Sequence, residues 1–396
     1  MKIFILSDYP SREKPTYYSF IKSRVEAIKG VCELSVIKVD INEKNRNVHE
    51  IIQEDGYRMI LLKIKKSNLP RVRLFLYNSL VKKVFEQLIK EEQPDLIHVH
   101  FSSYYSWIVA DTVRKLHIPF CITEHATFFE HRVNTFYFGR KIKMALQEAD
   151  MVFAVSRSLR DTMLKYISRP IEVKHNIVNT AKFSLRDGKQ HEEKQPKQAL
   201  NILTVGSFEL NDKKGYEILI KALAKLKEKG IPFQCKIIGE GPNKDNLLTL
   251  RDEHGITENV DFPGSVANDK LQEFYWEADF FVSSSRTETF GVVLIEAMSC
   301  GLPVVATRSG GPEDFVDDSV GLLVANESVD ALCEGMLLMA ARYRTYDSSI
   351  IRQTIENRFS ADRYKEQMQG IYASLIDTNK KHRDYSLSLK HTYENR

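Results

Sequence analysis

Residues Ser284–Phe315 read SSRTETFGVVLIEAMSCGLPVVATRSGGPEDF, and this stretch indicates the fold class more clearly than any other. It contains a Phe290-Gly291 turn, an apolar helix, a Gly-Leu-Pro turn and the short strand Val304–Ala306 in direct succession. Strand-like and helix-like segments alternate in this way along most of the chain, as a parallel α/β sheet requires. We therefore expect an α/β protein.

Two glutamates, Glu288 and Glu296, lie eight residues apart on either side of this turn. On a helix that spacing corresponds to about 12 Å of rise, whereas two carboxyl groups acting on one glycosidic bond lie about 5–9.5 Å apart. The pair therefore suits two ends of one elongated ligand. Gly291 leaves backbone N–H groups free at a helix N-terminus, where a phosphate is favoured. Carboxylate, phosphate-binding amides and carboxylate follow one another in the order that suits a sugar, a diphosphate and a ribose. Two glutamates at this spacing alone also fit a solvated helix face.

The whole segment resembles the donor-site signature of retaining glycosyltransferases of family 4, in which Glu-x7-Glu carries Phe-Gly just after the first glutamate. The resemblance covers roughly residues 1–375. It implies the GT-B fold, in which two Rossmann-like parallel-sheet domains face each other across a cleft. It also implies a hexosyltransferase-type enzyme that uses a nucleotide-diphosphate sugar.

The chain length agrees with two domains, because 396 residues exceed one ordinary core. We expect an N-terminal acceptor-binding domain over 1–183, a polar linker over 184–199 and a C-terminal nucleotide-sugar-binding domain over 200–360. In the GT-B fold, a helix over about 361–376 would return to the first domain, leaving a loosely ordered tail over 377–396.

Short apolar runs predict the strands, and amphipathic patterns such as Tyr17–Lys29, Val72–Lys90 and Tyr104–Leu116 predict helices between them. The expected strands are Lys2–Ser7, Leu34–Val39, Arg58–Lys63, Leu96–His100, Pro119–Thr123, Met151–Val155 and Ile171–Lys174 in the first half, and Ile202–Val205, Gln234–Ile238, Val260–Phe262, Phe280–Ser283, Val304–Ala306 and Gly321–Val324 in the second.

Composition predicts a soluble, cytoplasmic protein. Hydrophobic residues make up 43 % and charged residues 28 % of the chain, and no run of eighteen apolar residues occurs. The start MKIFILSDYP reads as a strand without a signal-peptide cleavage pattern. Five scattered cysteines fit reduced thiols, and they form neither a disulfide framework nor a zinc site.

The segment 63–84 is strongly basic, with seven lysines and arginines and no acid, interleaved with apolar residues. This pattern fits peripheral contact with an anionic membrane, such as the inner face of the cell membrane. It fits equally well an ordinary helix with one buried and one solvated face. Nucleic acid is not expected as a partner, because no aromatic-basic RNA motif or DNA-reading pattern accompanies the segment.

The resemblance extends to loops that follow other strands of the second half. Lys214 matches a family lysine that neutralises the diphosphate, and Ser207 stands where arginine is common, which predicts weaker neutralisation. Glu288 would bind sugar hydroxyls, and Glu296 would bind the ribose. The donor-binding residues implied are Gly206, Ser207, Lys214, Ser265, Val266, Glu288, Thr289, Phe290, Gly291, Val292 and Glu296.

The first half would hold the acceptor. Thr123-Glu124-His125 resembles the family's Thr-x-His, whose histidine approaches the transferred sugar, although a lone histidine is also often structural. The resemblance places His100 and Ser156 on the acceptor side and gives His98 a packing role. The chain departs from the family at Ile177, which replaces a usual glycine, and in the loop 9–20, which contains none.

These features predict a retaining, metal-independent transferase with His125, Glu288 and Lys214 as catalytic residues. The family's route is front-face attack, in which the leaving phosphate oxygen takes the acceptor proton. No Asp-x-Asp occurs where a metal-dependent transferase would need one, and no cofactor is expected besides a UDP- or GDP-linked co-substrate. The acceptor would be a saccharide or lipid-linked glycan of polysaccharide or glycolipid biosynthesis.

Two other functions remain open. A GT-B nucleotide-sugar epimerase would share the fold but needs an acid/base pair at the sugar. A non-catalytic partner subunit of a glycosyltransferase would explain the departures at Ser207 and Ile177, whereas retention of Glu288, Glu296 and Lys214 argues for an active enzyme.

Overall fold

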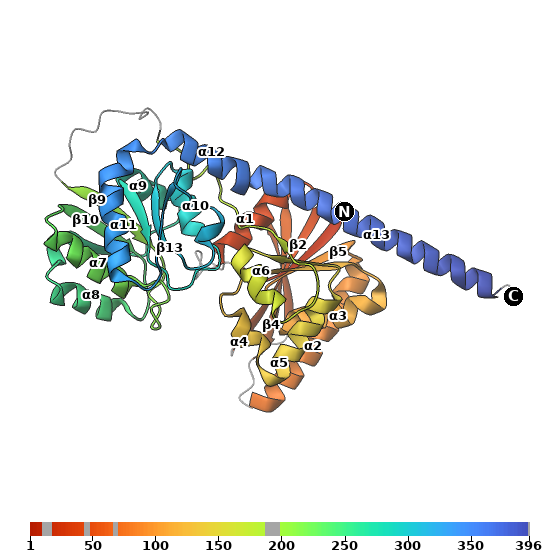
Figure 1. Ribbon diagram of the computed structural model, residues 1–396. Helices are drawn as coiled ribbons and strands as arrows, with labels where there is room; N and C mark the ends of the chain where they lie inside the picture. The colour runs from red at the N-terminus through yellow and green to blue at the C-terminus, as the bar shows by residue number, and fades with distance from the viewer. Residues whose placement is uncertain (10–17, 43–47, 66–69, 187–198, 395–396) are drawn as a thin grey trace. The chain divides into compact units, whose positions relative to one another are not determined.

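The computed structural model describes residues 1–9, 18–42, 48–65, 70–186 and 199–394 (Figure 1). The chain divides into two compact α/β units, each with its own largely parallel sheet, as the GT-B expectation required. Unit 1 comprises Met1–Val155, Arg160–Lys174 and Tyr364–Arg396, and unit 2 comprises Ser156–Leu159 and His175–Arg363. Most of the expected linker and of the glycine-free loop 9–20 lies outside the described residues.

The sheet of unit 1 has eight strands, and all neighbours are parallel except β3 and β4. The central strands are buried along their whole length, which explains their continuous apolar sequences. In spatial order the strands are β3 (Val48–Glu54), β4 (Tyr57–Lys65), β2 (Glu33–Asn42), β1 (Lys2–Leu6), β5 (Leu96–His100), β6 (Phe120–Glu124), β7 (Met151–Ala154) and β8 (Glu172–Val173).

The edge strand β3 was not expected from the sequence. It pairs antiparallel with β4 through a two-residue Asp55-Gly56 connection, and Gly56 has a φ of +82°. Asp-Gly between two apolar runs is a strong hairpin signal, because both loop residues tolerate positive φ. This antiparallel pair therefore adds an edge strand to the expected parallel sheet.

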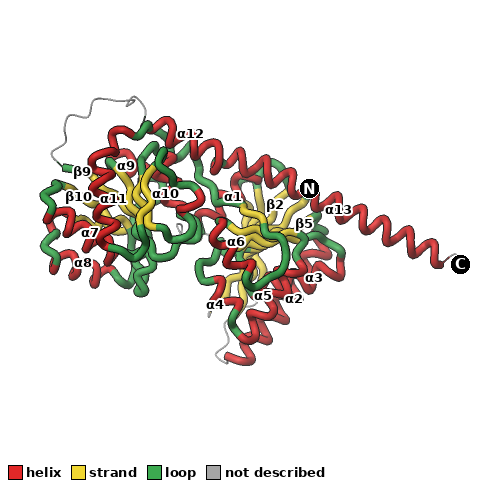
Figure 2. Tube along the Cα trace, viewed as in Figure 1, coloured by secondary structure: helices red, strands yellow, loops and turns green. Residues whose placement is uncertain are grey.

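Helices cover the sheet of unit 1 (Figure 2). α3 packs against α2 and against α5, so these three helices form one layer. The helices are α1 (Ser19–Ile28), α2 (Pro70–Glu92), α3 (Tyr104–Leu116), α4 (Phe129–Val133), α5 (Phe136–Glu148), α6 (Arg157–Leu164), which contains a unit boundary, and α13 (Ala361–Glu394).

The long helix α13 packs into unit 1 through Tyr364, Met368, Tyr372 and Ile376, which recur every four residues and are all buried. This spacing places them on one face of a helix. The helix continues to Glu394 and includes most of the tail expected over 377–396. No glycine or proline interrupts the sequence from 377 to 394, and nothing there ends the helix.

The sheet of unit 2 is entirely parallel, in the order β11-β10-β9-β12-β13-β14. Its strands are β9 (Leu200–Val205), β10 (Phe233–Ile238), β11 (Val260–Gly264), β12 (Phe280–Ser283), β13 (Val304–Thr307) and β14 (Gly321–Val324). Its helices are α7 (Tyr216–Glu228), α8 (Lys244–Glu253), α9 (Leu271–Glu277), α10 (Val292–Ser299), α11 (Val329–Arg342) and α12 (Ser348–Phe359), with short 3₁₀ turns at Thr257–Asn259, Pro312–Asp314 and Tyr343–Thr345.

The strand order of unit 2 reverses between β9 and β12. The chain proceeds outward from β9 to β11, then returns to add β12 on the other side of β9. Loops after two such strands diverge, and the carboxyl edge of the sheet at this point is where open α/β sheets bind ligands. The loops after β9 and β12 contain Lys214 and Glu288.

Within the segments that the structure describes, no helix is long and apolar enough to span a bilayer.

Candidate functional site

The loop from β9 to α7 is held in place by Asp212. Its buried carboxylate accepts hydrogen bonds from the N–H groups of Tyr216 and Glu217, at 2.8 and 3.2 Å, and so caps α7. Gly215 follows with a φ of +66°, and a Cβ there would lie 2.0 Å from the carbonyl oxygen of Ser284. The loop therefore packs directly on the end of β12, which sets the position of Lys214.

Lys214 and Glu288 form an ion pair across the point where the strand order reverses, with Nζ 2.5 Å from Oε2. Burial alone would raise the pKa of Glu288, but the charges of Lys214 and Lys213 and hydrogen bonds from Lys214 and the Phe290 N–H together lower it. Glu288 is thus an ionised carboxylate at neutral pH. The structure brings together two residues that the sequence assigned to different parts of the donor.

The loop after β12 presents free amides. Glu288 is fixed through its backbone: its N–H donates to Ser309 at 2.9 Å, and its carbonyl accepts from Gly311 at 2.7 Å. Gly291, with a φ of +103°, begins α10 without a side-chain cap. The N–H groups of Val292 and Val293 find no acceptor in the described part of the chain. An anion beside Glu288 would meet these amides and the positive end of the helix.

Glu296 lies on α10 and is only 9 % exposed. The Tyr275 hydroxyl donates to its Oε2 at 3.1 Å. Burial raises the pKa of Glu296 to about 7, and the Tyr275 hydrogen bond and the Lys182 charge oppose the rise. Sequence reasoning identified Glu296 but missed Tyr275, because a tyrosine 21 residues upstream gives no pattern that links the two.

The remaining donor-side residues lie in loops at the same edge of the sheet. The Gly206 N–H donates to Ile238 at 2.9 Å, and a Cβ on Gly239 would lie 1.8 Å from the Gly206 oxygen. The loops after β9 and β10 therefore need glycine for close approach. The Ser207 hydroxyl bonds to Glu209 at 3.1 Å. Ser265 and Val266 follow β11, exposed and half-buried respectively, while Thr289 is half-buried and Phe290 is buried.

In unit 1, His100 ends β5 and His125 follows the adjacent strand β6. The two rings contact each other, with Nδ1 of His100 2.9 Å from Nε2 of His125. Both are buried. Burial lowers the pKa of His100 well below its usual value, and charge repulsion from His98 and His125 lowers it further. His98 is a packed histidine, bonded to Tyr372 and Thr123 at 2.7 Å each.

Glu124 holds the loops around these histidines and was not singled out by sequence reasoning. It is fully buried, and its carboxylate accepts from the backbone N–H groups of Ser102, His125 and Ala126 at 2.7–2.9 Å. The Ser102 hydroxyl donates to it as well. Glu124 therefore fixes the backbone at His125.

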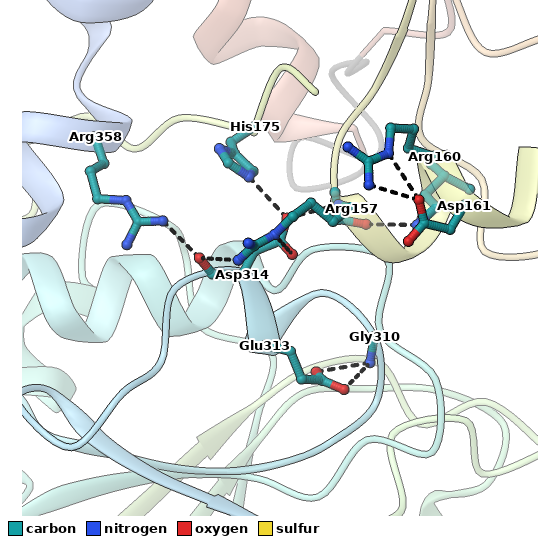
Figure 3. A network of polar contacts seen from close by, with 10 residues as sticks. Arg157, Arg160, Asp161, His175, Gly310, Glu313, Asp314 and Arg358 are labelled. Carbon is teal, nitrogen blue, oxygen red and sulfur yellow. Dashed lines mark hydrogen bonds and ion pairs between the residues drawn. The ribbon is translucent and has the colours of Figure 1, made fainter. Parts of the chain in front are cut away.

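Ser156 is assigned to unit 2, and its buried hydroxyl accepts from the Leu159 N–H at 3.1 Å, which caps α6. The next residue, Arg157, donates to Asp314 through its backbone N–H at 2.8 Å and through Nε at 3.0 Å. His175 Nε2 bonds to the same carboxylate at 3.0 Å, and Arg358 donates to the Asp314 carbonyl at 2.7 Å (Figure 3).

Asp314 and its three partners Arg157, His175 and Arg358 form the Asp314 network. This network contacts the donor loop through an aromatic ring. The ring of His175 lies 5.4 Å from that of Phe290. Burial alone would raise the pKa of Asp314, but the hydrogen bonds from His175 and Arg157 outweigh it and lower the pKa. The network was missed because its members lie 44 to 157 residues from Asp314.

No three histidine, cysteine or acidic side chains among the described residues are grouped so that they could hold a metal ion.

Comparison with known proteins gives consistent matches. Residues 186–350 match the family described as "Glycosyl transferases group 1", and residues 46–182 match "Glycosyltransferase Family 4". The phosphatidylinositol N-acetylglucosaminyltransferase gpi3 subunit of Schizosaccharomyces pombe is 23 % identical over 294 residues, which are 73 % of this chain and 60 % of that protein.

Solved structures are similar over nearly the whole chain. Sucrose-phosphate synthase from Thermosynechococcus elongatus superposes with a TM-score of 0.75 at 19 % identity, covering 95 % of this chain and 99 % of that one. Anabaena HepE in complex with UDP gives a TM-score of 0.71 at 19 % identity, covering 94 % and 100 %. At this identity the likeness shows a shared fold.

Proposed function

This chain belongs to the family 4 glycosyltransferases with the GT-B fold, and from that premise we propose that it transfers a sugar from a UDP- or GDP-sugar to a saccharide or lipid-linked acceptor with retention of configuration. One observation carries the proposal: the Lys214–Glu288 ion pair lies in the loops beside the free amides of Val292 and Val293. A lysine, a carboxylate and unpaired amides match the three chemical needs of a sugar diphosphate.

Donor binding would exchange one partner for another. An entering diphosphate competes with Glu288 for Lys214, and its oxygens also accept hydrogen bonds from the N–H groups at the start of α10. Glu288, released but still ionised, then accepts hydrogen bonds from the sugar hydroxyls. Glu296 accepts from the ribose hydroxyls, with its orientation held by Tyr275. Ser265 and Val266, in the loop after β11, would meet the base.

The chemical step needs charge stabilisation at the leaving group. Negative charge grows on the diphosphate as the bond to the sugar breaks, and Lys214 and the α10 amides would stabilise this charge. In front-face attack the leaving phosphate oxygen accepts the acceptor proton, so no side chain acts as base. His125, held by Glu124 and His100, would hydrogen-bond the transferred sugar, with His100 and Ser156 on the acceptor side. We further propose that the reaction needs no metal ion.

The acceptor is proposed from chemistry and from relatives together. The fission yeast relative is by its name a subunit that acts on phosphatidylinositol, a membrane lipid. A cytoplasmic enzyme at the inner face of a membrane, in contact through the basic segment 63–84, would meet lipid-linked glycans of polysaccharide or glycolipid biosynthesis.

Thermal unfolding with UDP, GDP, ADP and CMP, each with and without EDTA, tests the donor site. At 100 times its dissociation constant, a ligand of the native state adds about 2.7 kcal/mol. We expect one diphosphate to stabilise the wild type in EDTA and to have little effect on Lys214→Met. Lys221→Met, at an exposed position on α7, is the matched control and should respond like the wild type.

Two further outcomes decide between functions. The isolated chain could be stabilised by a nucleotide and yet transfer no sugar. If a second subunit then restores sugar transfer, the chain is a non-catalytic partner subunit and not the enzyme. With the stabilising nucleotide's sugar as donor, NMR of the product's anomeric proton measures retention, and an inverted product would refute the front-face route.

A further inference from the structure

Helix α5 carries apolar side chains on its solvent side. Phe136 is 101 % exposed and Met144 is 41 % exposed, and the exposed Arg140 lies midway between them. Residues four apart share one helix face, so the three form a single stripe. Phe128, 54 % exposed, stands just before α4. Single exposed apolar residues are ordinary, but Phe136 and Met144 lie on one face of the same helix.

The stripe does not arise from poor packing of α5. The opposite face buries Ile142, Ala145 and Leu146 in unit 1. Gly139 lies so close to α4 that a Cβ would be 2.1 Å from the Val133 carbonyl oxygen. Because the core face is complete and the contact with α4 is tight, Phe136 and Met144 are held toward solvent.

The surroundings of the stripe are basic. Residues 128–144 contain two arginines and two lysines against one acid, Glu130. The cations lie over aromatic rings: Arg132 is 4.7 Å from the centre of Phe128, and Lys141 is 3.8 Å from that of Trp107. Arg132 also donates to the Ser102 carbonyl at 3.5 Å, whereas Arg140 is exposed to solvent.

Helices α2 and α5 belong to one helical layer of unit 1, because α3 packs against both of them. The sequence of α2 contains four of the seven lysines and arginines of segment 63–84. Aromatic anchors beside lysine and arginine are the combination that binds the headgroup region of an anionic bilayer.

We propose that the stripe formed by Phe136, Arg140 and Met144 on α5 binds an anionic membrane, with Phe136 entering the headgroup region. This rests on the proposed peripheral location and assigns the contact to a surface outside segment 63–84. The excess of positive charge favours lipid over a second copy of this chain, which would bring like charges together.

Flotation of the full chain with phosphatidylcholine vesicles, with or without phosphatidylglycerol, tests the proposal. We expect salt-sensitive binding to the anionic vesicles. Phe136→Ser and Arg140→Glu should each lower the partition coefficient about tenfold. Matched controls are Ile51→Ser, at a 53 % exposed position on the edge strand β3, and Lys221→Glu on α7, which should bind like the wild type.

Nucleotide-dependent thermal stabilisation, measured on every variant, shows that each is folded and reports on the donor site separately. If Phe136→Ser and Arg140→Glu bind as the wild type does, the assignment to this face is overturned while membrane association stands. If the wild type binds no vesicle, both membrane proposals fail and the donor site is unaffected. If sedimentation shows a dimer that Phe136→Ser dissociates, the face joins two copies of the chain and the lipid assignment is wrong.

Discussion

Replacing Glu296 by glutamine should stabilise the protein, and by an amount that grows with pH. Burial raises the pKa of Glu296 from 4.5 to about 7. Each unit corresponds to about 1.36 kcal/mol, so the ionised carboxylate costs roughly 3 kcal/mol in the folded state. Between these two pH values the folded chain binds more protons than the unfolded chain, and stability therefore falls as pH rises. Glutamine keeps the size of the side chain and removes the charge.

The difference in unfolding free energy between Glu296→Gln and the wild type is the quantity to measure, by urea denaturation at pH 5 and at pH 8. We expect the variant to gain about 2–3 kcal/mol relative to the wild type between these two conditions. Glu258→Gln, an exposed glutamate on a 3₁₀ turn of unit 2, should gain almost nothing. Equal differences at both pH values would refute the conclusion that burial controls this carboxyl group.

The nucleotide provides a second readout of the same group. In the proposed donor complex, ribose hydroxyls would donate to an ionised Glu296 and would offset the cost of burying its charge. Nucleotide binding should therefore release a proton near pH 6.5 in the wild type and none from this position in Glu296→Gln, which calorimetry in buffers of different ionisation enthalpy would detect.

Three other substitutions test separate parts of the site. Lys214→Met should abolish stabilisation by the diphosphate while leaving a folded protein, measured by thermal unfolding. Gly215→Ala should cost more than Gly230→Ala in unfolding free energy, by about 1–3 kcal/mol, because both glycines have positive φ but only the first would clash with backbone. Asp314→Asn should lower the free energy of unfolding by about 1–2 kcal/mol. The loss is no larger because the side chain of its partner Arg157 is 59 % exposed. Asp318→Asn, at an exposed position, should leave the free energy of unfolding unchanged.

Local sequence patterns were sufficient for most of the fold. The strands Leu96–His100, Phe280–Ser283 and Gly321–Val324 agree with the structure at both ends, because each is a short apolar run that ends at a loop. The β3–β4 hairpin was not predicted, although Asp55-Gly56 between two strand-like segments is a hairpin signal. The last helix extends beyond its expected end at 376, because no glycine or proline in the polar sequence that follows ends it.

The site was predictable only where a motif is contiguous in sequence. Glu288, Gly291 and Glu296 lie within one loop and helix and could be named together. Contacts such as Tyr275 with Glu296, or His175 with Asp314, depend on how separate strands and helices pack, and the identity of one residue says nothing about its distant partner.

The return of α13 to unit 1 has a consequence for the order in which the protein is made. Tyr372, which bonds to His98, leaves the ribosome after all of unit 2 has been synthesised. Unit 2, continuous from His175 to Arg363 apart from four earlier residues, can fold first, while the earlier-made part of unit 1 waits with an incomplete core. During translation the first half of this chain is thus the last to complete its core.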